Sequence, residues 1–212
     1  MRREAEKPVV VIALITAVCL LGDTMLYVVL PIYWKSFGLT ALWQVGVLLS
    51  INRLVRLPLN PFVGWLYHRI SKRTGVLIAV GLSVITTCSY GFFSGFWLLF
   101  FMRCLWGVSW AFLRLGGFLT ILEVANQQNH GFLIGKYNGL WGLGGLAGML
   151  IGGFLVDLIG IEAVTFIFAA AALLNIPFVI RYVPDNVSDY EKRDESGRST
   201  FKQVWKPKMW FR

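Results

Sequence analysis

Six long apolar runs dominate this 212-residue sequence and limit its possible folds more than any other feature. Crossing the hydrocarbon core of a bilayer takes roughly 20 residues of helix. The predicted spans are residues 8–33, 42–66, 75–93, 96–119, 137–159 and 163–183. None of the runs alternates polar and apolar residues as the strands of a membrane β-barrel do. The sequence therefore predicts an all-α membrane protein with six transmembrane helices.

The overall composition also favours burial in lipid. Hydrophobic residues make up 57% of the chain and charged residues 15%, whereas soluble domains carry about a quarter charged residues. A chain of this size cannot bury so much apolar surface in a core of its own. The first run is too long for a signal peptide, and no small-residue cleavage site follows it, so we expect it to be retained as a span.

The basic residues predict the orientation of the chain in the membrane. With six spans, both termini and the second and fourth connections lie on one side, and the connections on the other side carry only Lys35. Basic residues favour cytoplasmic loops, so we expect both termini, including a polar linker or tail at 184–212, to be cytoplasmic. The predicted location is the cell (inner or plasma) membrane. The net charge of +9 then follows mostly from topology. Nucleic-acid binding is the weaker alternative, because no soluble basic fold is visible.

Two short segments indicate an internal repeat. Residues 64–71 read GWLYHRIS and residues 153–160 read GFLVDLIG, with Gly, an aromatic residue and Leu in the first three positions. The first segment ends the second span and the other ends the fifth, so spans one to three and four to six are predicted to be copies. Three crossings are an odd number, so the copies would face opposite ways. Inverted repeats of this kind are characteristic of secondary transporters.

The segment GWLYHRISKR at 64–73 carries a recognisable loop pattern. Gly64, Arg69, Lys72 and Arg73 match the loop between the second and third spans of the major facilitator superfamily, and the chain resembles the N-terminal six-helix half of that family. His68 stands where the family has an aspartate, and a serine replaces the second glycine. The resemblance implies that these residues form a gating loop whose usual acidic latch is altered.

The resemblance extends to the fourth and fifth spans. Arg103 followed four residues later by a glycine fits the fourth-span pattern, and the fifth span carries a glycine ladder. Met149 stands where antiporters of the family have a proline, which weakens an antiport assignment. Glycines four apart let helices pack closely, either inside the bundle or in a dimer. The predicted packing glycines are Gly107, Gly135, Gly144, Gly148, Gly152 and Gly153.

Five ionisable residues lie at membrane depth: Asp23, Arg53, Arg56, Arg103 and Arg114. Such groups are costly in lipid and usually face a cavity or a partner. At ~1.5 Å per residue, Asp23 lies roughly 22 Å and Arg103 about 20 Å above the cytoplasmic face. We expect these two to pair, as the equivalent residues do in the family. The carboxylate could carry a proton, or the pair could simply fix helix register. Arg114 is expected to reach the inner headgroups.

The second span has a polar face. Asn52, Arg56 and Asn60 are four residues apart and share one side of a helix, with Arg53 alongside. Two prolines in this span can bend it. The face suits the lining of a cavity for an anionic or strongly polar substrate. Alternatively, the arginines contact neighbouring helices or extend to headgroups.

The predicted function is secondary transport of a small molecule, such as an organic anion or a drug, by alternating access, with proton coupling as one option. The predicted substrate and proton pathway is Asp23, Asn52, Arg53, Arg56, Asn60 and Arg103. A second six-helix half, from the same or another chain, is the expected partner. The alternative is a truncated, non-transporting membrane remnant or interaction scaffold. No enzyme constellation, cofactor motif or metal-ligand spacing is found, so none of these is expected.

Overall fold

The computed structural model describes residues 2–126 and 128–184, with side chains from residue 6 onward. In this part of the chain all regular secondary structure is helical, which confirms the predicted all-α fold. The helices are α1 (Arg2–Ile32), α2 (Leu42–Tyr67), α3 (Lys72–Phe92), α4 (Phe96–Val124), α5 (His130–Ile159), α6 (Ile161–Leu173) and α7 (Asn175–Tyr182). Apart from Pro184, the predicted tail at 184–212 lies outside the described residues.

The ends of several helices follow from single residues. Ser71 has an extended backbone and its Oγ accepts a hydrogen bond from the Thr74 N–H at 3.2 Å, so it caps the first turn of α3. Gly95 precedes α4 with φ 102°, and Gly160 separates α5 from α6 with φ 84°. These backbone angles are open to glycine at little steric cost. The two tight connections therefore depend on glycine.

Several helix bounds differ from the predicted spans, and two of the differences have a clear physical cause. α5 begins at His130 rather than at residue 137, because Lys136 ends the apolar run without ending the helix. Lysine is a good helix former, and its Nζ lies 2.5 Å from a carboxylate oxygen of Glu6. The last predicted span is divided into α6 and α7 at Leu174. Pro177 explains this break, because a proline ring clashes with the carbonyl four residues earlier, here at Leu173.

Five helical segments of the described chain are long and apolar enough to cross a membrane: α1, α3, α4, α5 and the combined α6–α7 segment. α2 has 26 residues, which is long enough to span. It does not qualify on composition, because its middle carries Asn52, Arg53, Arg56 and Asn60. The predicted span that does not qualify, residues 42–66, is therefore the one with a polar face.

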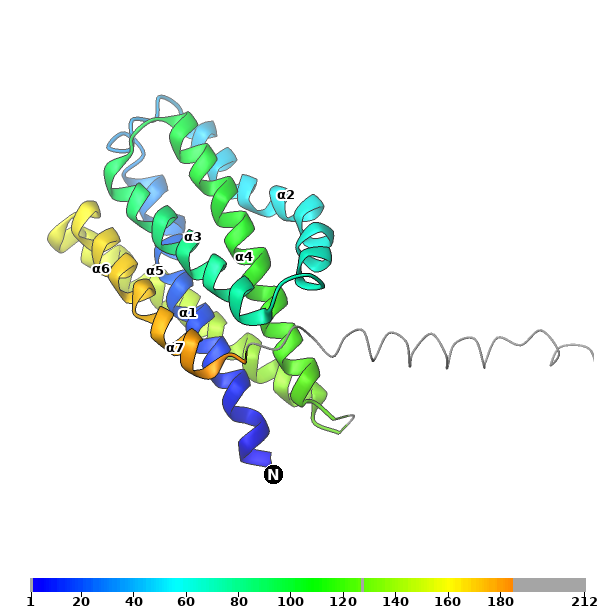
Figure 1. Ribbon diagram of the computed structural model, residues 1–212. Helices are drawn as coiled ribbons and strands as arrows, with labels where there is room; N and C mark the ends of the chain where they lie inside the picture. Colours follow the sequence, from blue (N-terminus) through cyan, green and yellow to red (C-terminus); the bar gives the residue numbers. More distant parts are fainter. Residues whose placement is uncertain (1, 127, 185–212) are drawn as a thin grey trace, which may run out of the picture.

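The helices pack side by side in a bundle (Figure 1). α1 makes its most extensive contacts with α5, α4 lies against α2 and α3, and α6 packs on α3. The α1–α2 and α3–α4 connections lie at one end, and the N-terminus and the α4–α5 connection lie at the other. α2 is visibly bent, and it contains Pro58 and Pro61. The inverted relation between the two groups of three helices stays a prediction.

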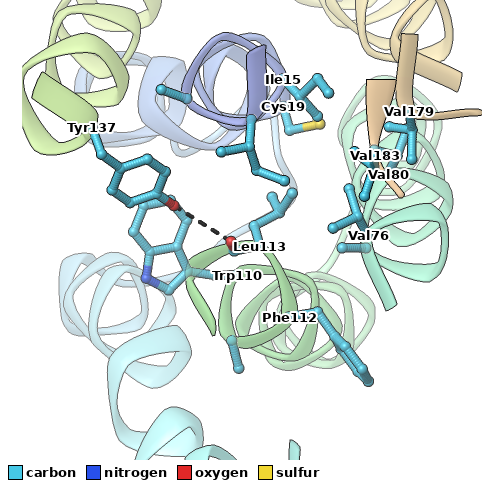
Figure 2. Close-up of a cluster of buried hydrophobic side chains, with 14 of the residues drawn as sticks. Ile15, Cys19, Val76, Val80, Trp110, Phe112, Leu113, Tyr137, Val179 and Val183 are labelled. Atoms are coloured by element: carbon cyan, nitrogen blue, oxygen red, sulfur yellow. Dashed lines mark hydrogen bonds between the residues drawn. The ribbon is translucent and has the colours of Figure 1, made fainter. Parts of the chain in front are cut away.

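Two apolar clusters fill the interior. The larger one joins α1, α2, α3, α4, α5 and α7, and Figure 2 shows Cys19 of α1, Val80 of α3 and Leu113 of α4 among its side chains. The Tyr137 hydroxyl of α5 donates a hydrogen bond to the Leu113 carbonyl at 3.4 Å in this cluster (Figure 2). The second cluster, nearer the other end of the bundle, is built around Met25 of α1. The functional residues described next lie between the two clusters.

Candidate functional site

A buried ion pair joins α1 and α4. An Arg103 Nη1–H donates to a carboxylate oxygen of Asp23, and the two residues are only 1% and 3% exposed. The Arg103 Nε–H also donates to the Leu48 carbonyl of α2 at 2.9 Å. The Asn52 amide of α2 donates to the same Asp23 oxygen at 3.5 Å. The pairing predicted from matching depths is therefore confirmed, and it draws three helices together.

The position of this pair follows from the apolar pattern on each helix. On α1 the larger apolar cluster ends at Leu20 and the second begins at Met25, so Asp23 lies in the gap. On α4 the second cluster includes Leu99 and the larger cluster starts at Trp106, so Arg103 lies in a matching gap. A charge on either helix alone would be buried without compensation. The two gaps meet at one level and form a polar layer.

A pocket of about 420 Å³ adjoins this layer. α1, α2, α4 and α5 contribute its walls, which consist of Leu20, Asp23, Thr24, Tyr27, Arg53, Arg56, Trp110, Arg114, Trp141, Gly142, Gly145, Leu146 and Met149. Of the predicted pathway residues, the pocket brings together Asp23, Arg53 and Arg56. Asn52 and Arg103 lie behind it as partners of Asp23.

Asn60 does not line this pocket and is exposed farther along α2. The shared-face prediction assumed a regular helix, and Pro58 and Pro61 on either side of Asn60 disrupt that regularity. Arg114 lines the pocket and is exposed, and its expected reach to the inner headgroups stays a prediction. Its guanidinium carbon lies 5.5 Å from the centre of the Phe118 ring.

Aromatic rings lie against two arginines of the pocket, and the sequence analysis did not predict these rings as site residues. The guanidinium carbon of Arg56 lies 5.1 Å from the centre of the Trp110 ring, and that of Arg53 lies 5.6 Å from Tyr27. The rings of Trp110 and Trp141 pack edge to face, with their centroids 5.1 Å apart. A usable signal existed, because these two tryptophans lie inside apolar runs, whereas tryptophan in membrane helices favours the interface.

The predicted gating loop is tied to other helices of the same bundle. Lys72, at the start of α3, forms an ion pair with Glu123 near the end of α4, and Lys72 is 5% exposed. The Arg73 Nε–H donates to the Val183 carbonyl after α7 at 2.9 Å. These contacts join three helix ends, and sequence reasoning had not identified Glu123 as a partner.

The remaining loop residues lie farther out. The Arg69 guanidinium carbon is 4.6 Å from the centre of the Trp65 ring, and both residues are exposed. His68 is exposed as well. Gly64 lies at the edge of the α2–α4 contact, where an added Cβ would be 3.9 Å from Leu115. The gating role of all five loop residues stays a prediction.

The glycine ladder forms the contact between α5 and α1. An added Cβ at Gly144, Gly148 or Gly152 would collide with Ala17, Leu21 and Thr24, or Met25 of α1. A Cβ added at Gly153 would lie 3.2 Å from Val28, and one added at Gly107 would lie 3.0 Å from the Asn52 backbone carbonyl oxygen. These glycines allow close packing inside the bundle.

Gly135 is the exception, because nothing lies within 4 Å of a Cβ added there. It precedes Gly144 by nine residues, about two and a half turns of helix, so it points to the opposite side of α5. The prediction that Gly135 packs against a helix is therefore wrong for contacts within this chain.

The opposite end of the bundle carries a separate polar contact. The Tyr33 hydroxyl, just beyond the end of α1, donates a hydrogen bond to Asp157 of α5 at 2.5 Å. This bond to a carboxylate is the main cause that raises the pKa of Tyr33. Across the described residues, no group of three or more His, Cys, Asp or Glu side chains is placed to hold a metal ion.

Comparison with known proteins places this geometry in context. The family model for the Major Facilitator Superfamily matches residues 12–211. Multidrug resistance protein MdtG of Proteus mirabilis is 30% identical over 179 residues, which covers 82% of this chain and 44% of that protein. MdtG of Klebsiella pneumoniae is 27% identical over 187 residues, covering 85% and 45%. The human chromaffin granule amine transporter is 29% identical over 133 residues, covering 62% and 25%. The chain thus spans less than half the length of these relatives.

Proposed function

Because this chain is a multi-pass membrane protein that belongs to the Major Facilitator Superfamily, we propose that it is the N-terminal half of a secondary transporter for a small molecule. Its relatives named as transport or resistance proteins support this function over a non-transporting remnant or scaffold. The relatives are about twice as long. A second six-helix half, continuous with this chain or separate from it, supplies the opposite wall of the transport route.

The observation that carries the proposal is the pocket beside the Asp23–Arg103 pair. It borders the larger apolar cluster at Leu20 and Trp110, and four different helices form its walls. In secondary transporters a central site is exposed to each side in turn as the two halves rock. A largely apolar pocket with one aspartate and three arginines, walled by this bundle, fits such a site.

The ion pair suits a role in coupling. Asp23 forms one wall of the pocket, while Arg103 holds its charge from behind. When a proton binds the carboxylate, the electrostatic attraction to Arg103 is lost and the contact between α1 and α4 weakens. Substrate binding and proton binding would then act on the same helices, and the two events would be linked. Asp23 is the proposed proton carrier and Arg103 the residue that positions it.

The basic loop completes the proposal for topology. Lys72 at the start of α3 and Lys136 near the start of α5 are paired with Glu123 and Glu6, in keeping with an assignment of both regions to the cytoplasmic side. We place both termini there as well. Reporter fusions after residue 70 and at the C-terminus should both give a cytoplasmic signal, and signals from opposite sides would refute this topology.

Transport is tested with a complete protein. The chain is expressed with a six-helix second half, either encoded with it or taken from the Proteus mirabilis relative, and efflux of a panel of fluorescent drugs and organic anions is measured in membrane vesicles with an imposed pH gradient. Asp23→Asn and Arg103→Ala should each abolish gradient-driven transport. Arg181→Gln, which changes an exposed arginine outside the pocket, should have no effect. Unchanged transport by both pocket variants would refute the assigned roles.

A further inference from the structure

The charge of the pocket is unbalanced. Asp23 is its one acidic lining residue, and Arg103 already neutralises it from behind. Arg53, Arg56 and Arg114 also line the pocket, and within the described part of the chain no ion pair joins any of them to a carboxylate. Three guanidinium groups at one pocket would repel one another, and an anion bound among them would offset this repulsion.

Two of these arginines lie against aromatic rings. Arg56 rests near the Trp110 ring at 5.1 Å, and Arg53 near Tyr27 at 5.6 Å. A guanidinium held against a ring keeps its in-plane N–H groups available, and these bind a carboxylate through two parallel hydrogen bonds. The Nε of Arg56 is buried and has no hydrogen-bond partner. A bound anion would satisfy this donor.

The rest of the pocket favours a planar ring. Trp141 meets Trp110 edge to face, and the Trp141 indole N–H donates to Asn138 of its own helix at 3.0 Å. This hydrogen bond helps fix the orientation of the Trp141 ring. The pocket volume of about 420 Å³ is within the range of small-molecule sites. Gly142 and Gly145 of α5 leave room beside the tryptophans.

We propose that this pocket binds a planar aromatic anion, with its carboxylate or sulfonate on Arg53 and Arg56 and its ring against Trp110 and Trp141. The inference takes the location of the site from the proposed function and adds the class of substrate. A cationic ligand would meet three unneutralised arginines and an aspartate that is already paired. The charge preference is therefore opposite to that expected for an amine.

Binding to the purified 212-residue chain in detergent tests the proposal by isothermal titration. Three probes separate ring from charge: 2-naphthoate, 2-naphthylmethylammonium and cyclohexanecarboxylate. We expect 2-naphthoate to bind with a Kd below about 1 mM and the other two at least about tenfold more weakly. Equal or tighter binding of the cation, or no binding of 2-naphthoate, would overturn the proposal.

Variants assign the contacts. Arg56→Gln should weaken 2-naphthoate binding by about ten- to a hundredfold, as expected for a lost charged hydrogen bond. Arg56→Lys, which keeps the charge but not the planar fork, should bind with intermediate affinity. Trp141→Leu should weaken 2-naphthoate but leave cyclohexanecarboxylate unchanged. Arg181→Gln is the matched control. Size-exclusion profiles equal to the parent's show that the variants fold, and parental affinity in Arg56→Gln would overturn the assignment.

The two proposals fail separately. Binding of 2-naphthoate without transport by the complete protein would refute the proposed function and leave this inference standing. Gradient-driven transport of cationic drugs, together with no binding of 2-naphthoate, would support the proposed function and refute the aromatic-anion site.

Discussion

The α1–α5 contact can be tested with one substitution made at two places on α5. Gly148 packs against α1, whereas Gly135 has open space around it. Gly148→Ala and Gly135→Ala add the same methyl group to the same helix. They gain the same intrinsic helix preference, about 1 kcal/mol per residue. Any difference between them therefore reports the space around each glycine.

The magnitude follows from the distances. At Gly148 the new Cβ would lie 2.8 Å from the Leu21 carbonyl oxygen and 2.9 Å from the Leu21 Cα, with the Thr24 side chain closer still. Backbone atoms cannot rotate away, so α1 and α5 must separate, and overpacking of this kind costs about 1–3 kcal/mol. Separation would also loosen the contacts at Gly144 and Gly152. After the helix preference is included, we expect a net loss of up to about 2 kcal/mol for Gly148→Ala and a gain of about 1 kcal/mol for Gly135→Ala.

Thermal unfolding of the purified chain in one detergent, followed by tryptophan fluorescence, measures both variants. For a chain of this size, 1 kcal/mol corresponds to about 2–4 °C in Tm. Gly148→Ala should therefore melt up to about 8 °C below the parent and Gly135→Ala about 2–4 °C above it. If Gly148→Ala were as stable as Gly135→Ala, close packing at the glycine ladder would be refuted.

Two other predictions concern the polar contacts. Asp23→Asn should destabilise the chain by about 3–5 kcal/mol because Arg103 stays buried without its counter-charge; Arg103→Gln should cost less, since an unpaired carboxylate can take up a proton. A double-mutant cycle in the same melting assay measures their coupling, and strictly additive losses would contradict the pair. The raised pKa of Tyr33 means that its hydrogen bond to Asp157 stabilises the fold below the ordinary tyrosine pKa of about 10 and is lost as pH rises through the raised value. Alkaline absorbance titration of the parent minus Tyr33→Phe should show this shift, Asp157→Asn should remove it, and an unshifted parent curve would count against it.

Much of the candidate site could be predicted from the sequence. Asp23 and Arg103 were matched by counting residues from the ends of their spans, and the count succeeded because both helices are regular between those ends and the charge. The same reasoning failed for Asn60, because Pro58 and Pro61 flank it and disturb the regular helix. It also failed for Gly135, which was grouped with the other glycines of α5 although it lies on the opposite side of that helix. Counting residues along a helix predicts a position only where the helix is regular, and it predicts a contact only where the residue faces the same neighbouring helix.

The sequence by itself determined that this chain forms helices suited to a membrane, because in lipid a helix satisfies its own backbone hydrogen bonds and needs only length and apolar composition. It also determined which residues had to avoid lipid. Only the tertiary structure decided where those residues go: that Arg114 joins the pocket, that Trp110 and Trp141 form its aromatic wall, and that Glu123 pairs with Lys72. These outcomes depend on how each helix is rotated about its axis and which helix it faces. Contacts between segments far apart in the chain set that rotation, and no local pattern records it.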